Sequence, residues 1–363
     1  MKIILLYGGQ SAEHEVSIIS AHTICQLIMY GYYQVQPIYL TKDGRWLKGP
    51  LLEQPPTSVK QLTLEEGQEA SWANSDDEVS YGVAINPGEI QEPDVIVFPV
   101  LHGPNGEDGT IQGFLEVLNL PYVGAGVTAS ANGMDKIISK SLFDQIGLPQ
   151  VPYVAFNALD WRTNEDEIVQ RCEGSLIYPL FVKPANMGSS VGISRVENAD
   201  ELKAAVNLAF KYDRRIVVEQ GIIAQECEVA VLGNDDAHVS VVGRLVKQQD
   251  FYDYNEKYIN NTVTMEIPAD LPESVTARIQ EYALKAYRVI DGRGLSRVDF
   301  FVTSNNDVYI NEINTLPGFT PFSMYPLLWQ ETGLSQRDLI EELLQLALRS
   351  HETKQMLKQP LNH

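Results

Sequence analysis

The segment from residue 294 to residue 323, GLSRVDFFVTSNNDVYINEINTLPGFTPFS, restricts the fold of this chain more than any other stretch. It contains two β-rich runs, RVDFFVT and DVYINEIN, around the turn-forming residues Ser304, Asn305, Asn306 and Asp307. Asn and Asp tolerate the positive φ angles that tight hairpin turns require. The pattern therefore predicts an antiparallel hairpin with a two-residue loop at Asn305 and Asn306.

A two-residue loop fixes which residues of the hairpin lie opposite each other. It pairs Asp299 with Glu312 and Arg297 with Asn314. Because side chains alternate between the two faces of a strand, these four polar residues share one face. The other face is apolar and is predicted to lie in the core; it comprises Val298, Phe300, Val302, Tyr309 and Ile313. Asn311 fits this register poorly, because it falls on the apolar face.

Asp299 and Glu312 carry like charges, and directly opposed carboxylates destabilise a sheet unless a positive charge lies between them. A bound cation would remove the repulsion. Two carboxylates and the amide oxygen of Asn314 suit a hard ion that keeps several waters and also binds substrate phosphates, which describes Mg²⁺. The alternative is a solvated edge hairpin whose polar residues bind nothing.

The bulk properties of the sequence restrict the class of protein. A chain of 363 residues is long enough for two or three domains. Its formal net charge of -21 disfavours binding to nucleic acid or to anionic membranes. The apolar start, IILLY, is too short for a signal peptide or a membrane span, and the three cysteines are far apart. We therefore expect free thiols and a cytoplasmic location.

The first hundred residues predict an open α/β layer. Apolar runs at 2–7, 35–40 and 94–101 are typical of strands covered on both faces, and the polar segment 45–93 is expected to be a surface excursion with short strands. Glu13 and His102 follow the first and third of these strands, at the strand ends where open sheets bind ligands. Each has a structural alternative: Glu13 could complement a helix dipole, and His102 could support a turn.

The sequence YVGAGVTA at 122–129 matches the dinucleotide fingerprint G-x-G-x-x-A. In a dinucleotide-binding domain that fingerprint follows the first strand, whereas here at least three strands precede it. A tight turn into a helix is the preferred interpretation, and a dehydrogenase is the alternative. The helix is predicted to run from about 129 to 147 and to mark a domain boundary, with one apolar face made of Met134, Ile137, Ile138, Leu142 and Ile146.

The next region, 150–218, alternates short strands and helices around the loop ANMGSSVG at 185–192. This loop can direct backbone N–H groups and two hydroxyls toward an anion, although a plain Gly/Ser turn is the commoner structure. Lys183 supports a phosphate site, because a lysine on a buried strand needs an anionic partner. Later, QQDFYDYNEKYINNT at 248–262 has no strand or helix period, which predicts either a lid over a site or a surface loop.

Four motifs occur in the order and spacing of one family. HGPNGEDGTIQG, FVKPANMGSSVG, DYNEKY and RVDFF with YINEINTLPGFTPFS together resemble the D-alanine:D-alanine ligases of the ATP-grasp superfamily. The resemblance covers nearly the whole chain except 45–93. It implies an ATP-grasp fold, α/β in class and α+β overall. The implied parts are an N-terminal open α/β domain at 1–128, a small central domain at 129–218 and a C-terminal mixed-sheet domain at 219–363.

The resemblance implies ATP-dependent ligation of two D-alanines through a D-alanyl phosphate, in the synthesis of peptidoglycan precursors. It implies that two Mg²⁺ ions, with Mn²⁺ as an alternative, bind at Asp299, Glu312 and Asn314 and contact the β- and γ-phosphates. The residues expected to bind the phosphates directly are Lys136, Lys183, Ser189, Ser190 and, in the lid, Lys257. Those expected to bind the nucleoside are Glu219 and Ile222 for the adenine and Glu226 for the ribose.

The same resemblance assigns residues to the two amino-acid sites. Glu13 would bind the ammonium group of the first D-alanine, with His102 nearby, and Ser323 would bind the carboxylate of the second. The guanidinium of Arg297 and the backbone N–H of Gly318 would form the oxyanion hole. A hydrogen-bonded triad of Glu13, Ser189 and Tyr258 would tie the lid to the first domain.

Tyr258 also bears on the second substrate. Relatives that make the D-alanine:D-lactate depsipeptide resemble this chain but carry Phe at that position, so Tyr258 favours the dipeptide. The alternatives are a D-alanine:D-lactate or other D-alanine:D-X ligase, and a nucleotide-binding protein without turnover. A protein without turnover would have lost a metal carboxylate or the lid lysine, whereas Asp299, Glu312 and Lys257 are present. The sequence does not determine the oligomeric state, and a homodimer is compatible with it.

Overall fold

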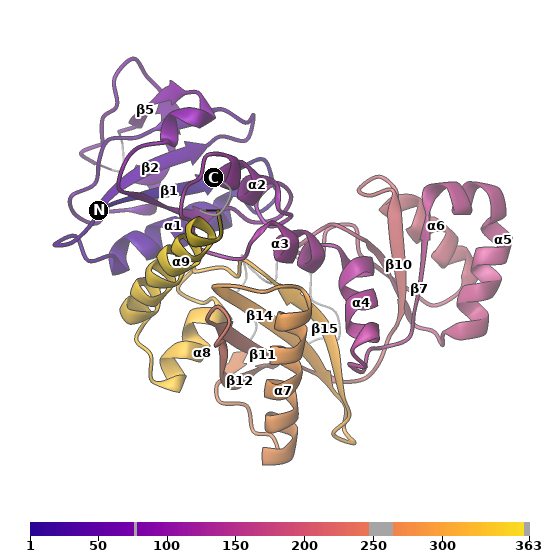
Figure 1. The fold of residues 1–363 in the computed structure, drawn as a ribbon. Coiled ribbons are helices and arrows are strands. Elements are labelled where there is room, and N and C mark those ends of the chain that lie inside the picture. The colour runs from indigo at the N-terminus through magenta and orange to yellow at the C-terminus, as the bar shows by residue number, and fades with distance from the viewer. Residues whose placement is uncertain (76–77, 247–263, 359–363) are drawn as a thin grey trace.

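The computed structural model describes residues 1–75, 78–246 and 264–358, and their strands form three sheets (Figure 1). The first sheet has the strand order β4-β5-β3-β2-β1-β6. Its strands are β1 (Lys2–Gly8), β2 (Gln34–Leu40), β3 (Trp46–Lys48), β4 (Leu64–Glu66), β5 (Ser80–Ile85) and β6 (Val95–Val100). Strands β2, β1 and β6 are parallel neighbours, which agrees with the predicted open α/β layer.

Two helices and two short 3-10 helices accompany the first sheet. They are α1 (His14–Leu27), η1 (Val59–Leu62), η2 (Pro87–Ile90) and α2 (Thr110–Val117). The segment 45–93 contains β3, β4, β5, η1 and η2, so the prediction of an excursion with short strands is confirmed. Because β1 and β6 are neighbours, the residues that follow them come together at one edge of the sheet.

The region after the first sheet folds as two helices, α3 (Val127–Met134) and α4 (Lys136–Gln145). The prediction of one helix from about 129 to 147 is therefore wrong. Asp135 has extended backbone angles, and its side chain accepts hydrogen bonds from the N–H groups of Ile137 and Ile138. This N-cap ends one helix and begins the next. The break turns α4, which leaves Ile138 and Ile146 exposed rather than on a shared apolar face.

The second sheet is antiparallel, with the order β7-β10-β8-β9. Its strands are β7 (Tyr153–Asn157), β8 (Leu180–Pro184), β9 (Ser194–Val196) and β10 (Arg215–Gln220). Helices α5 (Ala158–Ser175) and α6 (Ala199–Ala209) cover one face, where Val182 and Val218 lie in the core. Since side chains alternate along a strand, Tyr153, Lys183 and Glu219 project from the opposite face.

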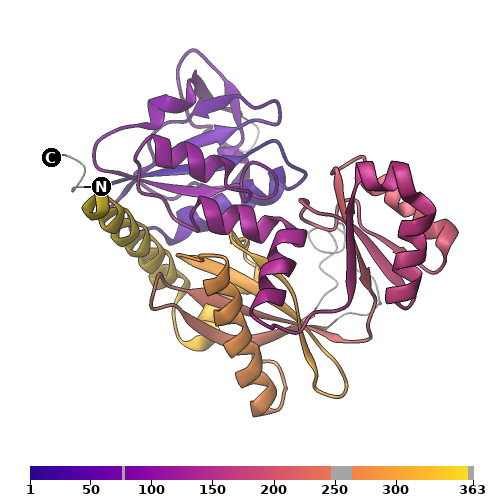
Figure 2. The ribbon, with the colours of Figure 1, turned by 45° about the vertical axis from the view of Figure 1, so that its right-hand side comes forward.

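The third sheet has the order β13-β12-β11-β14-β15. Its strands are β11 (Gln225–Leu232), β12 (His238–Val246), β13 (Thr264–Glu266), β14 (Leu295–Val302) and β15 (Val308–Asn314). The accompanying helices are α7 (Glu273–Val289), α8 (Met324–Thr332) and α9 (Gln336–Lys358). Helix α9 runs back to the first sheet in both views, and Leu343 shares a core with Ile3 and Tyr7 (Figures 1 and 2). None of the described helices is both long enough and apolar enough to cross a membrane.

The base of the β14–β15 hairpin has the predicted register. Arg297 lies opposite Asn314, and Asp299 lies opposite Glu312. Val298 and Ile313 are buried in the core that packs against α7, so the polar and apolar faces are also as predicted at this end. The sequence pattern thus identified the four polar residues that share one face of the hairpin.

The loop of the hairpin differs from the prediction. The N–H of Thr303 donates to the carbonyl of Asp307 at 3.0 Å, so the loop is one residue longer than the predicted pair. A bulge lies between the Asp299–Glu312 and Phe300–Ile310 pairs and leaves Asn311 as the extra residue on β15. The bulge moves Ile310, rather than Tyr309, into the core. The bulge explains why Asn311 did not fit the predicted register. It also explains why the longer loop left the pairing at the base of the hairpin unchanged.

Candidate active site

The predicted site residues come from segments that meet around α4. Helix α4 lies between the second and third sheets in both views (Figure 2). Residues from the loop after β1, the loop after β8, α4, β10 and β14–β15 face this region, as the contacts below show. Lys257 and Tyr258 lie outside the residues that the structure describes.

Glu13 links the first sheet to the phosphate loop. It occupies the N-cap position of α1 but makes no side-chain cap, and its carboxylate accepts a hydrogen bond from the hydroxyl of Ser189. Glu13 therefore contacts the predicted phosphate loop and also lies at the start of α1, where a carboxylate complements the helix dipole. Ser189 and Ser190 have φ angles of 50° and 59°, a strained region for residues other than glycine. A Cβ on Gly188 would lie 3.2 Å from Glu13, so the loop approaches the carboxylate closely.

Lys136 joins the phosphate loop to the hairpin. Its Nζ donates to the backbone carbonyl of Met187 at 2.7 Å and lies 3.9 Å from Oε2 of Glu312. Burial lowers the pKa of Lys136, and the carboxylate of Glu312 opposes that effect. The backbone N–H of Lys136 also donates to the carbonyl of Ala185 at 2.9 Å. One lysine thus lies within reach of both the phosphate loop and the predicted metal face.

Lys183 has the anionic partner that its buried position required. Its Nζ donates to Oε2 of Glu219 at 2.6 Å, and Nζ of Lys140 lies 3.0 Å from Oε1 of the same carboxylate. Burial alone would raise the pKa of Glu219, but Lys140 and Lys183 outweigh burial and hold the pKa at about 2. Sequence reasoning missed Lys140. The signal was its spacing of four residues from Lys136, which places both lysines on one side of a helix.

The polar face of the hairpin is neutralised by protein cations. The guanidinium of Arg297 donates to both oxygens of Asp299 at 2.8 and 2.7 Å, and its Nε lies 3.0 Å from Glu228. Glu228 lies opposite Asp299 on β11 and was also missed from the sequence. Arg297 and Lys136 thus supply positive charge beside Asp299 and Glu312. The repulsion between the two carboxylates therefore does not by itself require a metal ion, which corrects the sequence argument.

The donor set on this face nevertheless suits a hard cation. Asp299 and Glu312 contribute carboxylate oxygens, and the side-chain oxygen of Asn314 already accepts the N–H of Leu316 at 3.0 Å. Within the described ranges, no cluster of three or more His, Cys, Asp and Glu residues could hold a metal. The predicted set differs from such a cluster because its third member is an amide. Oxygen donors with room for water and phosphate are the ligands that Mg²⁺ prefers.

His102 and Glu107 are both buried, and the charge of Glu13 influences each of them. Nε2 of His102 has no hydrogen-bond partner among the described residues, and burial lowers the pKa of its ring against the influence of Glu13. Glu107 accepts the N–H of Gly103 at 2.7 Å, and its pKa is raised well above the usual value by burial and then by Glu13. Burial thus favours the neutral form of the His102 ring. Glu107 lies in the HGPNGEDG motif but was not selected from it.

Gly318 and Ser323 lie close together at the other side of the hairpin. A Cβ on Gly318 would lie 3.1 Å from the hydroxyl of Ser323, which accepts the N–H of Thr320 at 2.9 Å. The N–H of Phe319 donates to Ser20 in α1 at 3.2 Å, which anchors this segment to the first sheet. Of the remaining predicted residues, Ile222 is partly exposed between β10 and β11, and Glu226 lies at the start of β11 opposite Phe301.

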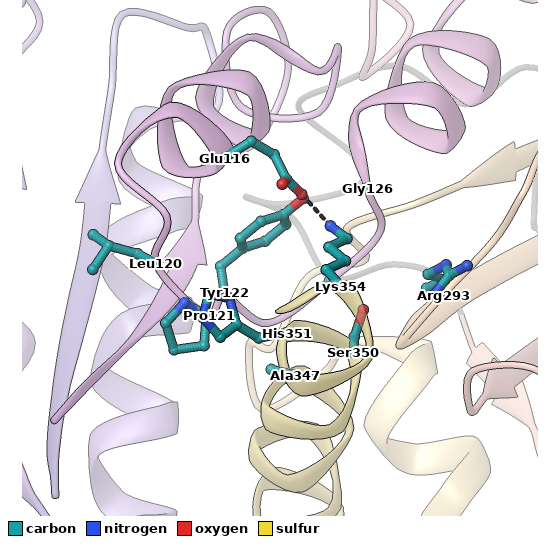
Figure 3. A pocket seen from close by; sticks show the side chains of 11 residues that line it. Glu116, Leu120, Pro121, Tyr122, Gly126, Arg293, Ala347, Ser350, His351 and Lys354 are labelled. Atoms are coloured by element: carbon teal, nitrogen blue, oxygen red, sulfur yellow. Dashed lines mark hydrogen bonds and ion pairs between the residues drawn. The ribbon is translucent and has the colours of Figure 1, made fainter. Parts of the chain in front are cut away.

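The glycines of the fingerprint at 122–129 lie in a turn beside a small pocket. Gly124 has a φ of 111°, and Gly126 precedes α3, so the segment is the predicted tight turn into a helix. The pocket beside these glycines has a volume of about 20 Å³, which is space for about one water molecule. Lys354 from α9 forms an ion pair with Glu116 across it (Figure 3). The dehydrogenase alternative is therefore not supported, and none of the predicted site residues lines this pocket.

Comparisons with known proteins identify the family that this chain resembles. The family description "D-ala D-ala ligase N-terminus" matches residues 2–125, and "D-ala D-ala ligase C-terminus" matches residues 142–345. The chain is 59% identical over 350 residues to the D-alanine–D-alanine ligase of Enterococcus faecalis, which covers 96% of this chain and 99% of that one.

Two solved structures resemble the fold. The D-alanine–D-alanine ligase of Coxiella burnetii has a TM-score of 0.78 and 36% identity, covering 99% of this chain and 97% of that chain. The VanG D-Ala:D-Ser ligase of Enterococcus faecalis has a TM-score of 0.80 and 33% identity, covering 95% of this chain and 99% of that chain. The match extends over the whole described fold, so the family and the fold are those expected from the sequence motifs.

Proposed function

The chain belongs to the D-alanine–D-alanine ligase family, with its ATP-grasp fold, and on that premise we propose that it joins two D-alanines in a reaction driven by ATP. The carboxylate of one D-alanine attacks the γ-phosphorus of ATP, and ADP leaves. The amine of the second D-alanine then attacks the acyl phosphate, and phosphate leaves as the amide bond forms. The product, D-alanyl-D-alanine, is a precursor of peptidoglycan, and its synthesis is proposed to occur in the cytoplasm.

The position of Lys136 is the observation that carries the proposal. Phosphoryl transfer depends mainly on positioning and on neutralising charge. Lys136 is bonded to the phosphate loop and lies 3.9 Å from Glu312, so it can approach a phosphate held between that loop and the hairpin. Together with Lys183, it gives a strongly acidic chain a local concentration of positive charge where a polyphosphate needs it.

The remaining contacts to ATP follow from the same arrangement. The hydroxyls of Ser189 and Ser190 and the backbone of their loop would bind the phosphates, with Lys257 closing over them from the lid. Glu219 and the backbone at Ile222 would bind the adenine, and Glu226 would bind the ribose. The proposed role of Glu219 in adenine binding is supported by its burial and its lowered pKa, because an ionised carboxylate accepts hydrogen bonds from an amino group.

We propose that the amino-acid sites lie beside the phosphate loop, where Glu13 accepts a hydrogen bond from Ser189. Glu13 would bind the ammonium group of the first D-alanine, with His102 nearby, whose Nε2 has no hydrogen-bond partner among the described residues. Ser323 would bind the carboxylate of the second D-alanine. Arg297 and the N–H of Gly318 would stabilise the oxyanion of the tetrahedral intermediate. The contact between Glu13 and Ser189 supports the proposed triad, whose third member is Tyr258.

Asp299, Glu312 and Asn314 are proposed to bind two Mg²⁺ ions, or Mn²⁺ in their place. When bound, the ions supply charge neutralisation for the β- and γ-phosphates. The oxygen donors on one face of the hairpin support this assignment. Glu228 gives Arg297 a second carboxylate partner besides Asp299, so the guanidinium stays oriented if Asp299 turns to an ion.

We propose a division of the chain at 1–128, 129–218 and 219–363, because the first and third sheets lie within the first and last ranges and the second sheet lies within the middle range except for the last two residues of β10 (Arg215–Gln220). Two helices pack against a sheet of another proposed domain. Phe143 of α4 lies in the core of the third sheet, and α9 packs on the first sheet. A homodimer is proposed as the assembled state, which sedimentation of the purified protein tests.

The direct test of the function is phosphate release from ATP by the purified chain. It should depend on D-alanine and not on L-alanine, and turnover that is indifferent to D-alanine would contradict the proposal. A panel of acceptors at two pH values tests the second substrate. D-alanine should be preferred over D-serine and D-lactate at pH 8, and D-lactate should compete best at pH 6, where fewer amines are unprotonated.

A further inference from the structure

Glu219 is held by two lysines, and Lys140 has no part in the reaction described so far. We propose that Lys140 is a positioning residue for purine recognition. It holds the Glu219 carboxylate ionised and in place for the 6-amino group of ATP while Lys183 turns to the phosphates. The inference rests on the proposed role of Glu219 in adenine binding.

The position of Lys140 is fixed by its surroundings. Its residue is 1% exposed, and its ammonium lies 5.1 Å from the ring centre of Tyr153 on β7. Its backbone carbonyl accepts a hydrogen bond from the side chain of Gln150 at 2.8 Å. Within the described part of the chain, Glu219 is the one acid within ion-pair distance of Lys140. A buried ammonium costs free energy unless it is paired, so this side chain has little freedom to leave Glu219.

The two lysines approach Glu219 from different elements. Lys183 on β8 reaches Oε2, and Lys140 on α4 reaches Oε1. One lysine would neutralise the carboxylate, so the pair leaves an excess positive charge in a buried place. That excess suits an arriving phosphate. When Lys183 turns to the phosphates, Oε2 becomes free to accept a hydrogen bond, while Lys140 keeps hold of Oε1.

The ionisation of Glu219 decides which purine it prefers. An ionised carboxylate accepts hydrogen bonds only, so it favours an amino group and repels the carbonyl at position 6 of guanine or hypoxanthine. A buried carboxylate without a cation becomes protonated and can donate as well as accept. With Lys183 occupied by phosphate, Lys140 is the cation that prevents this change. Loss of Lys140 should therefore weaken the preference for a 6-amino purine.

The test compares ATP with purine riboside triphosphate, which lacks the 6-amino group, in D-alanine-dependent phosphate release by the full chain. A hydrogen bond to a charged group corresponds to a preference for ATP of about 10- to 100-fold in kcat/KM. Lys140→Met should reduce that preference to about threefold or less. The loss should lie in KM for ATP, with kcat changed less than about twofold. The control is Lys203→Met. Lys203 lies on α6, which covers the second sheet, and its partly exposed side chain pairs with Glu165 and Asp166. This variant should keep the full preference for ATP.

Glu219→Met, which has no strong hydrogen-bond acceptor, separates this inference from the proposed function beneath it. If Glu219→Met keeps the preference for ATP, Glu219 does not recognise adenine and the nucleotide assignment fails. If Glu219→Met loses the preference but Lys140→Met keeps it, the inference about Lys140 alone is overturned. In the Glu219→Met background, Lys140→Met should change the preference less than twofold, because the lysine acts through the carboxylate. An equal rise in KM for both nucleotides would show a merely structural lysine. Should Lys140→Met fail to fold, Lys140→Gln removes the charge while keeping an N–H donor and gives the same comparison.

Discussion

Replacing Glu219 with Gln should destabilise the protein strongly at neutral pH and much less at pH 3. The two lysines hold the pKa of Glu219 at about 2 in the folded protein, against 4.5 for an unperturbed glutamate. Each pH unit of difference corresponds to about 1.4 kcal/mol, so the ionised carboxylate contributes about 3 kcal/mol to the free energy of unfolding at pH 7. Because the folded-state pKa is depressed, this contribution is complete above about pH 4.5 and is lost as the pH falls toward 2.

At pH 3 the same linkage leaves about 1 kcal/mol, so the difference between wild type and Glu219→Gln should shrink by about 2 kcal/mol between pH 7 and pH 3. Urea denaturation followed by fluorescence and by circular dichroism measures it, provided that the two transitions coincide. The control is Glu197→Gln, which removes an exposed carboxylate paired with Arg195 and should stay within about 1 kcal/mol of wild type at both pH values. An equal destabilisation by Glu219→Gln at pH 7 and pH 3 would refute the ion-pair reasoning.

Three further predictions follow from the site and the fold. Glu312→Gln should reduce turnover by about 100-fold or more, because it removes charge from the proposed metal face. The melting temperature should stay nearly unchanged, because the side chain of Glu312 is 40% exposed. A variant that fails to fold would show that the face of the hairpin was misjudged. Ser189→Ala removes the hydroxyl that donates a hydrogen bond to Glu13. In steady-state kinetics it should lower kcat/KM for D-alanine by about 10- to 100-fold. Unchanged kinetics would exclude a role for this contact. Gly8→Ala should destabilise the protein by about 1–3 kcal/mol in urea denaturation, because φ at Gly8 is 91° and a Cβ would lie 2.2 Å from the carbonyl oxygen of Leu40. Gly31→Ala, where a Cβ meets nothing within 4 Å, is its control, and equal effects of the two changes would contradict the argument.

The hairpin shows how far the sequence determines local structure. Alternation of polar and apolar residues placed Asp299 opposite Glu312 because the two faces of a sheet have different surroundings. The same alternation could not reveal the bulge at Asn311, which depends on how the strand bends within the sheet. The longer loop and the bulge compensate for each other, so the prediction was right at the base and wrong at Tyr309.

The charged groups of the site show what the sequence could not supply. Lys183 on a buried strand predicted an anionic partner, but its identity as Glu219 depends on the pairing of β8 with β10. Lys140 was overlooked because a lysine on a helix is ordinarily exposed. The sequence argument for a metal ion did not count Arg297 and Lys136 as cations that offset the charges of Asp299 and Glu312. Pairings between distant segments are a property of the fold rather than of any one motif.

The fate of the carboxylate oxygen of D-alanine tests the proposed reaction most directly. The purified enzyme is supplied with ATP, Mg²⁺ and D-alanine whose carboxylate carries ¹⁸O, and the released phosphate is analysed by mass spectrometry. Attack of that carboxylate on the γ-phosphorus, followed by attack of the second amine, transfers one ¹⁸O atom to each phosphate. Phosphate that carries one ¹⁸O for each dipeptide formed is the predicted result. Phosphate without ¹⁸O would show that no acyl phosphate forms, and the account of the site would have to be abandoned.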